Sequence, residues 1–223
     1  MITLEDVKVS FKGLERPVLD IPFLQIGDGV KLAVTGISGS GKTTLINILC
    51  ALERIESGSI MWDNVALHSL DQMQQDRFRG ENVGLIMQDF YLYDGLSALQ
   101  NVLLPSKLRY FKVPEIITKR AVYLLERLNI SKHAQNVDML SRGEKQRVAI
   151  ARALVNTPKI IMADEPTASL DREISDEAVK LLVSLAYEFQ ATLICASHDR
   201  VLINKMDYCL ELEKGRKVEA SFL

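Results

Sequence analysis

Residues 36–43 read GISGSGKT, which fits the pattern G-x-x-x-x-G-K-[ST] of a phosphate-binding loop. The apolar, β-branched run at 30–34 precedes the loop and is typical of a buried strand. The run at 44–52 follows it and predicts a helix. A strand, a glycine-rich turn and a helix N-terminus in this order form an anion site, because backbone N–H groups and the helix dipole point toward the phosphates. The alternative is a glycine-rich turn without a ligand, and the flanking strand and helix favour the phosphate site.

The loop also carries the side chains that phosphate chemistry needs. Its glycines permit backbone turns that a side chain would block, and they let the backbone approach a ligand closely. Lys42 is placed to bridge the β- and γ-phosphates of a nucleotide, and the Thr43 hydroxyl is placed to bind Mg²⁺. The residues expected to contact the nucleotide here are Gly36, Ser38, Gly39, Ser40, Gly41, Lys42, Thr43 and Thr44.

Composition excludes several classes of protein. Apolar residues make up 48% of the 223 residues, enough for a sizeable core, so intrinsic disorder is not expected. The formal net charge is -2 and no basic block occurs, so the charge signature of a nucleic-acid binder is missing. No apolar run approaches the ~20 residues of a membrane span. Residues 1–6 lack the basic region and apolar core of a signal peptide. These features predict a cytoplasmic chain that reaches a membrane only through a partner.

Short apolar runs alternate with amphipathic helical stretches along the chain. This alternation predicts an α/β fold with a largely parallel sheet. From about 88 to 156 the pattern is helical, so we expect a helical block inserted into a sheet-bearing core formed by 1–87 and 157–223, all within a single domain. The expected strands are 2–11, 18–26, 30–34, 60–62, 83–87, 159–163 and 191–196, with a closing hairpin at 207–218, and the expected helices are 44–52, 70–79, 96–110, 114–128, 143–155 and 174–189.

Two carboxylates end the apolar strand at 159–163. In a nucleotide hydrolase with a phosphate loop, Asp164 would hold Mg²⁺, usually through water. The next residue, Glu165, would polarise the attacking water as a general base. The two acids could instead be the solvated end of the strand, but the phosphate loop in the same chain favours the catalytic interpretation.

A histidine follows the predicted strand at 191–196. The end of this strand places His198 at the edge of the sheet where ligands bind in such folds. From there it could donate a hydrogen bond to a γ-phosphate. A lone histidine is more often structural, so the residue pattern by itself leaves both roles open.

Together with the phosphate loop, five further segments resemble the nucleotide-binding subunit of an ABC transporter. Residues 140–154, LSRGEKQRVAIARAL, are similar to the LSGGQ signature and its helix. Gln88 resembles the Q-loop glutamine, residues 168–171 resemble the D-loop, and residues 197–199 resemble the H-loop. Phe11 lies where the family keeps an aromatic residue that stacks on adenine. The resemblance covers essentially the whole chain and rests on the order and spacing of the whole set.

The resemblance implies an ATP hydrolase with a RecA-like core, an antiparallel β subdomain and an inserted helical subdomain. It implies that two such domains pack head to tail around two ATP molecules. Each ATP would lie on the phosphate loop of one subunit and face Ser141 and Gly143 of the other, with Asp171 also at the nucleotide. The implied catalytic residues are Glu165, His198, Gln88 and Lys42, and the implied Mg²⁺ ligands are Thr43, Gln88 and Asp164.

A subgroup of this family is also indicated. Residues 92–105 and 162–167 resemble the lipoprotein-releasing and macrolide-export ATPases, of which the cell-division ATPase is a close relative. This resemblance implies an integral membrane permease as partner, with the ATPase peripheral on the inner face of the plasma membrane and dimeric, whether as a homodimer or a heterodimer. No nucleic-acid partner is expected.

The chain departs from the family at two signature positions. Arg142 replaces the first glycine and Glu144 replaces the glutamine. Arginine could alter the closed dimer or bring a cation near phosphate, so it affects the expected hydrolysis rate more than the fold.

Three other functions remain as alternatives. A regulatory ATPase of a cell-division permease is poorly separated from an exporter by sequence. A soluble ABC ATPase acting on DNA or ribosomes is disfavoured by the single domain and the missing basic patch. A nucleotide kinase or GTPase would leave Ser141, Gly143 and His198 unexplained.

Overall fold

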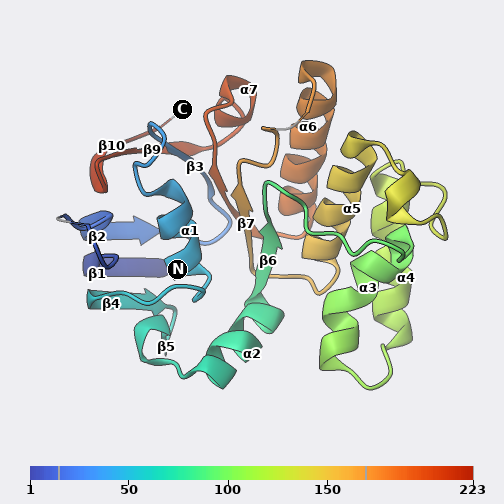
Figure 1. Cartoon of the computed structure of the whole chain (residues 1–223), viewed down its shortest axis with the longest axis horizontal. Coiled ribbons are helices and arrows are strands. Elements are labelled where there is room, and N and C mark those ends of the chain that lie inside the picture. The colour runs from blue at the N-terminus through green and yellow to red at the C-terminus, as the bar shows by residue number, and fades with distance from the viewer. Residues whose placement is uncertain (15, 169, 223) are drawn as a thin grey trace.

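The structure is a computed structural model that describes residues 1–14, 16–168 and 170–222 (Figure 1). Its strands form two sheets. A 4-stranded sheet has the order β2-β1-β4-β5, and a 6-stranded sheet has the order β10-β9-β3-β8-β7-β6. The strands are β1 Ile2–Val9, β2 Leu19–Ile26, β3 Lys31–Thr35, β4 Ser57–Trp62, β5 Val65–Ala66, β6 Val83–Ile86, β7 Ile160–Asp164, β8 Thr192–Ala196, β9 Tyr208–Glu213 and β10 Arg216–Phe222.

The 6-stranded sheet confirms the predicted α/β fold. β6, β7, β8, β3 and β9 pair in parallel, and β10 returns antiparallel to β9. Strand β8 is buried at every position, as expected for a parallel sheet covered on both faces. The pairing brings Asp164 opposite Ala196, and Ala196 opposite Val34. The carboxyl ends of β3, β7 and β8 therefore meet at one edge, where the phosphate loop, Glu165 and His198 follow them.

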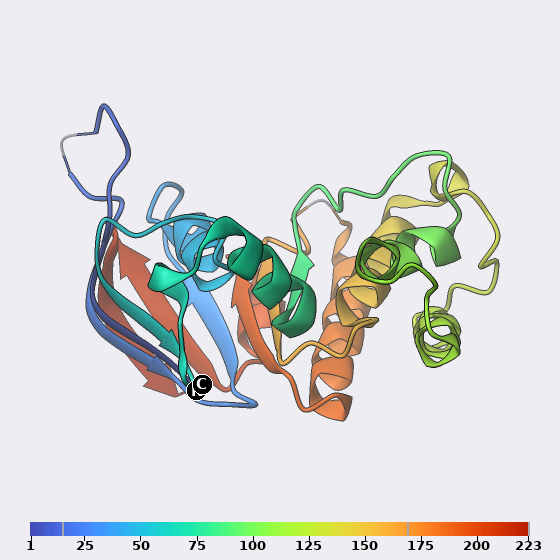
Figure 2. The same cartoon turned by 90° about the horizontal axis from the view of Figure 1, so that it is seen from below.

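The antiparallel sheet packs against the first helix of the chain. Its strands β1, β2 and β4 bury alternate side chains, as expected of a sheet with one face on the core. Helix α1, Lys42–Leu49, buries Leu45, Ile46, Ile48 and Leu49 in the same core as these strands. Figure 2 shows α1 lying between the antiparallel sheet and the parallel sheet. The helix that begins at the phosphate loop is thereby fixed from both sides.

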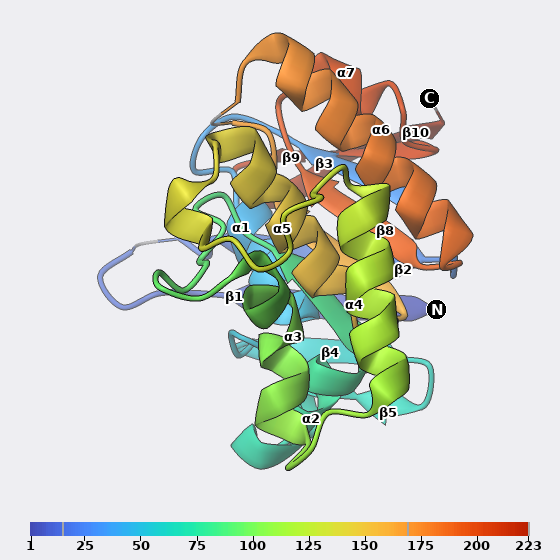
Figure 3. The same ribbon diagram turned by 90° about the vertical axis from the view of Figure 1, so that its right-hand side faces the viewer.

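The remaining helices lie beside the parallel sheet or beyond it. They are α2 Gln72–Asn82, α3 Ala98–Arg109, α4 Glu115–Arg127, α5 Arg142–Leu154, α6 Arg172–Glu188 and the short α7 Arg200–Ile203, together with the 3₁₀ turns Leu67–Ser69 and Val137–Met139. Figure 3 shows α3, α4 and α5 grouped on one side of the molecule, with α6 next to α5. Among the described residues no helix is both long and apolar enough to cross a bilayer.

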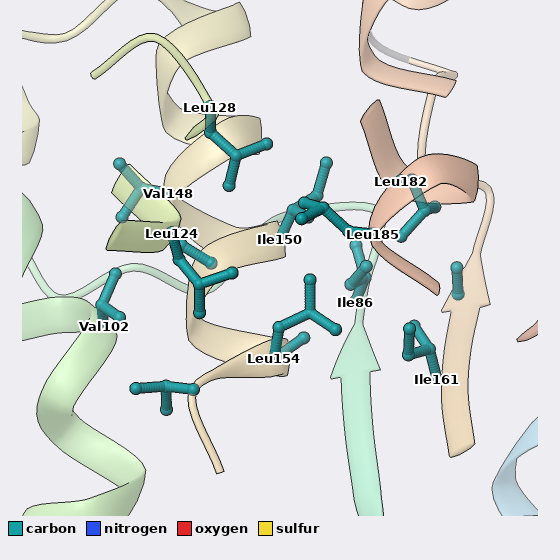
Figure 4. Close-up of a cluster of buried hydrophobic side chains, with 14 of the residues drawn as sticks. Ile86, Val102, Leu124, Leu128, Val148, Ile150, Leu154, Ile161, Leu182 and Leu185 are labelled. Atoms are coloured by element: carbon teal, nitrogen blue, oxygen red, sulfur yellow. The ribbon is translucent and has the colours of Figure 1, made fainter. Parts of the chain in front are cut away.

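Helix α5 joins this helical group to the parallel sheet. One hydrophobic core contains Val102 of α3, Leu124 of α4 and Leu154 of α5 together with Ile161 of β7 and Leu182 of α6 (Figure 4). Fully burying one such aliphatic side chain stabilises the fold by roughly 1.5–3 kcal/mol. Helix α5 therefore shares one core with both the helical group and the parallel sheet.

Candidate functional site

The phosphate loop connects β3 to α1 through turns that only glycine adopts easily. Gly36 has φ 137°, and a Cβ there would lie 2.2 Å from the backbone oxygen of Leu212, so no other residue fits. Lys42 begins α1, and its Nζ donates hydrogen bonds to the backbone oxygens of Gly36 at 2.8 Å and Ile37 at 3.2 Å. The Lys42 ammonium group is therefore held against the loop backbone at the N-terminus of α1.

A cavity of about 630 Å³ lies against this loop. The volume lies within the ~300–1,000 Å³ typical of small-molecule sites. The structure places four of the predicted residues from outside the loop in its wall, namely Gln88, Asp164, Glu165 and His198. The predicted loop residues that line it are Gly36, Ser38, Gly39, Ser40, Gly41, Lys42, Thr43 and Thr44.

Two oxygen donors for a metal meet in this cavity. The Thr43 hydroxyl donates a hydrogen bond of 2.8 Å to Oδ2 of Asp164. Burial and the nearby Glu165 carboxylate raise the pKa of Asp164, while the Thr43 hydrogen bond and Lys42 oppose that shift. A hydroxyl and a carboxylate are hard oxygen ligands of the kind Mg²⁺ prefers, and a cation there would offset the cost of the buried charge. The residues present therefore fit Mg²⁺.

Glu165 and His198 form a contact at the edge of the cavity. Nδ1 of His198 lies 3.0 Å from a carboxylate oxygen of Glu165. The histidine side chain is 76% exposed, whereas the Glu165 side chain is only 17% exposed. The Glu165 carboxylate is shielded from bulk water while His198 is exposed, and this arrangement suits Glu165 as a general base that acts on a water beside the phosphates.

Gln88 follows β6, and the turn after it is held by α5. The Arg152 guanidinium donates hydrogen bonds to the backbone oxygens of Phe90 and Tyr91. Burial lowers the pKa of Arg152. The segment that begins in the cavity wall at Gln88 is therefore tied within a few residues to the helix that carries the signature sequence.

The signature sequence forms the start of α5, and Ser141 is its N-cap. The Ser141 hydroxyl accepts a 3.3 Å hydrogen bond from the N–H of Glu144, and the Glu144 carboxylate accepts a 2.8 Å hydrogen bond from the N–H of Ser141. These two residues form a capping box, and the hydrogen bonds from Ser141 lower the pKa of Glu144. Glu144, one of the two departures from the family pattern, thus stabilises the helix start.

The family signature has glycine at both positions between Ser141 and Glu144, and this chain has glycine only at the second, Gly143. A Cβ on Gly143 would lie 2.6 Å from Cγ2 of Ile174 on α6, so a side chain there would push the two helices apart. Arg142, which replaces the other glycine, is exposed, so its side chain does not disturb the core.

Four predicted nucleotide-binding residues lie elsewhere. Among the described residues that line the cavity, Phe11, Ser141, Gly143 and Asp171 do not occur. Phe11 is 40% exposed in the loop between β1 and β2, and Asp171 is the exposed N-cap of α6. Within one chain these residues are therefore not brought to the phosphate cavity. Ser169 of the predicted D-loop lies outside the described residues.

Other residues at the site escaped the sequence analysis. Val18, Ile37 and Ala168 also line the cavity, and Thr167 and Asp199 lie directly behind Glu165 and His198. Thr167 and Asp199 lie in the segments 162–167 and 197–199 that resemble the family, but neither was predicted to be a site residue.

The comparisons with known proteins match one family and several of its members. A family model described as ABC transporter matches residues 20–168, a range that includes the phosphate loop, Gln88, Ser141 and Glu165. The lipoprotein-releasing system ATP-binding protein LolD of Treponema denticola is 38% identical over 195 residues, covering 87% of this chain and 86% of LolD. YbbA of Escherichia coli strain K12, an uncharacterized ABC transporter ATP-binding protein, is 40% identical over 197 residues, covering 88% of this chain and 86% of YbbA.

Among solved structures, the chain is similar to the ATP-binding cassette MJ0796, in a dimeric post-hydrolysis state bound to ADP and Pi. The TM-score is 0.90 at 32% identity, and the match covers 100% of this chain and 99% of that one. The similarity thus extends over the complete fold, including the antiparallel sheet and the helical group.

Proposed function

The chain belongs to the ABC transporter family and is an ABC-type ATPase, and from this premise we propose that it drives a separate membrane permease. The observation that carries the proposal is the single cavity lined by the phosphate loop, Gln88, Asp164, Glu165 and His198. These residues come from the ends of three parallel strands and from the turn after a fourth, and together they supply a cation, a metal site and a general base. In this proposal the protein lies on the inner face of the membrane, bound through the permease.

Hydrolysis follows from the roles of these side chains. Lys42 leaves the loop carbonyls and pairs with the β- and γ-phosphates, while the turns of the loop present backbone N–H groups to them. Thr43, Asp164 and Gln88 would hold Mg²⁺, which would supply positive charge against the phosphates. Glu165 accepts a proton from the attacking water. His198, held by Glu165 at the open side, donates a hydrogen bond to the γ-phosphate.

We further propose that two ATPase domains close around two ATP molecules. Ser141 is exposed at the start of α5 and Gly143 lies two residues further on, buried against α6; both are outside the cavity of their own chain, which leaves the start of α5 available to contact the nucleotide of a second chain. The dimeric cassette MJ0796 supports this by its similarity. ATP then binds the closed dimer more tightly than the open one, and loss of the γ-phosphate reopens it. Phe11 stacks on the adenine, and Asp171 also lies at the nucleotide.

Coupling to the permease would run through the helical group. In this proposal, residues 88–156 form a helical subdomain that rotates against a core made of 1–87 and 157–223. The link from Gln88 through Arg152 to α5 supplies the connection, because it ties the cavity wall to the signature helix. In this proposal, the surface near 88–105 would hold a cytoplasmic helix of the permease. Two relatives support the export or release class, LolD by its name and MacB as an ATP-binding/permease protein, of which this chain spans 32%.

The test is to identify what the protein binds in native membranes. A tagged Glu165→Gln protein should hold ATP without turning it over quickly, so membranes solubilised with Mg-ATP should yield a stoichiometric complex. Recovery of a polytopic permease supports the proposal, and the permease's outer domain would separate export from cell-division control. Recovery of ribosomes, DNA or the ATPase alone contradicts the membrane assignment while leaving the ATPase chemistry intact.

Asp164→Asn should weaken the metal site. The change keeps the shape of the side chain but removes the charge that faces Mg²⁺, so the Mg²⁺ concentration for half-maximal hydrolysis should rise about 10-fold. Removing Mg²⁺ with EDTA should stop turnover in both proteins. Asp138→Asn is the matched control, because its carboxylate accepts a hydrogen bond from the Gly95 backbone and does not line the cavity, so the Mg²⁺ dependence of this variant should stay unchanged. An unchanged Mg²⁺ titration for Asp164→Asn would contradict the assigned ligand.

A further inference from the structure

We propose that Asp199 is a positioning residue for Glu165, acting through Thr167 to fix the turn that aims the Glu165 carboxylate. This inference rests on the proposed role of Glu165 as the general base. It concerns side chains behind the cavity rather than the residues that touch the nucleotide.

The backbone at Glu165 is the reason such support is needed. Glu165 has φ 46°, in the left-handed region that residues with a side chain rarely adopt. A residue in that conformation persists only where its surroundings over-determine it. Two backbone hydrogen bonds contribute, one from Glu165 N to Ala196 O at 2.8 Å and one from Ala168 N to Glu165 O at 3.2 Å.

Asp199 binds the segment that follows this turn. Its Oδ2 accepts hydrogen bonds from the hydroxyl of Thr167 at 3.0 Å and from the hydroxyl of Ser175 at 2.9 Å. Its Oδ1 accepts the N–H of Val201 at 2.8 Å. Burial opposes the charge, but these hydrogen bonds outweigh it and hold the pKa of Asp199 below its usual value. One carboxylate thus joins three segments: the Glu165 turn, the start of α6 and the His198 loop.

A second path runs from Asp199 to the carboxylate itself. The fully buried Ser197 hydroxyl accepts the N–H of Asp199 at 3.1 Å and donates to Oε2 of Glu165 at 3.4 Å. Gln146 of the signature helix also donates a hydrogen bond to the backbone oxygen of Pro166. The segment 165–167 is therefore bound by residues from two other parts of the chain, and the Thr167 hydrogen bond links it directly to the Asp199 side chain.

Thr167 and Ser175 provide a matched pair of variants. Their hydroxyls bind the same Asp199 oxygen at nearly the same distance, and they are 6% and 5% exposed. Only Thr167 belongs to the Glu165 turn. Thr167→Val should lower kcat about 10-fold with little change in KM, because a small displacement of the base mainly affects the chemical step. Ser175→Ala should change kcat by less than about 3-fold, although it removes a comparable bond.

Two further variants separate positioning from general destabilisation. Thr167→Ser keeps the hydroxyl and should retain the wild-type kcat. In the Glu165→Gln background, adding Thr167→Val should cause no further loss, because the base it positions is already gone. Equal losses in Thr167→Val and Ser175→Ala, or an undiminished loss in the Glu165→Gln background, would overturn the inference alone. Wild-type turnover by Glu165→Gln itself would overturn the proposed role of Glu165 and this inference with it.

Discussion

Glu165→Gln should lower the rate of ATP hydrolysis by about 10²- to 10⁴-fold, the range that general base catalysis supplies. Glutamine keeps the size of the side chain and can still contact His198, but it cannot take a proton from water. Lys42, Thr43 and Asp164 are untouched, so ATP affinity should remain near that of the wild type. Single-turnover phosphate release measures the first quantity, and equilibrium binding of labelled ATP measures the second.

A control variant separates the loss of the general base from the loss of one negative charge. Glu126→Gln makes the same chemical change at an exposed position on α4, away from the cavity, and should leave turnover unchanged. The variant also reports on the dimer, because ATP that is bound but not hydrolysed should hold two domains closed, visible as a dimer by light scattering. Hydrolysis by Glu165→Gln within 10-fold of the wild type would mean that another group activates the water.

Much of the fold could be predicted from local sequence. The apolar runs at 30–34, 159–163 and 191–196 became β3, β7 and β8, because a strand buried on both faces needs apolar residues at nearly every position. Helix boundaries were less accurate. The helix predicted at 44–52 is α1, Lys42–Leu49, since the helix begins within the phosphate motif and ends before Cys50.

Gln88, Asp164, Glu165 and His198 could be predicted from sequence because each lies at or shortly after the end of a strand. The side chains that hold them could not, because the relevant pairs are far apart in the chain. Ser175 and Asp199 are separated by 24 residues, and Gln146 and Pro166 by 20, so no local pattern marks either contact. The positive φ of Glu165 is likewise set by its tertiary contacts and not by its residue type.

The signature sequence illustrates a different limit. Read as a family motif, Glu144 is a substitution with an uncertain effect. The same four residues, Ser141 to Glu144, also fit the S-x-x-E pattern of a helix capping box, and the structure contains that box. The Glu144 carboxylate is already hydrogen-bonded to the start of its own helix. Of the two residues that differ from the family signature, Arg142 is therefore the one whose side chain faces solvent at the proposed dimer surface.

Lys42→Ala should weaken ATP binding about 10- to 100-fold, because it removes a hydrogen-bonding charge worth roughly 1.5–3 kcal/mol. Turnover at saturating ATP should fall by about 10²- to 10³-fold, since the ammonium group also stabilises charge on the phosphates as the bond breaks. The structure shows what the substitution removes. Among the contacts of the described residues, Nζ of Lys42 donates hydrogen bonds to the loop carbonyls of Gly36 and Ile37, and its charge opposes the raised pKa of Asp164.

Thermal unfolding can show whether Lys42→Ala loses activity because it binds ATP weakly or because the fold itself is destabilised. Lys119→Ala is the control for net charge, because this lysine is exposed on α4 and pairs only with Glu115 one turn away in the described structure. Both variants should unfold within a few degrees of the wild type without nucleotide. Added ATP should raise the melting temperature of Lys119→Ala as it does that of the wild type, and should raise that of Lys42→Ala much less, because ligand stabilisation scales with the logarithm of ligand concentration over Kd. Equal stabilisation of both variants by ATP would show that the loop holds the phosphates through its backbone alone.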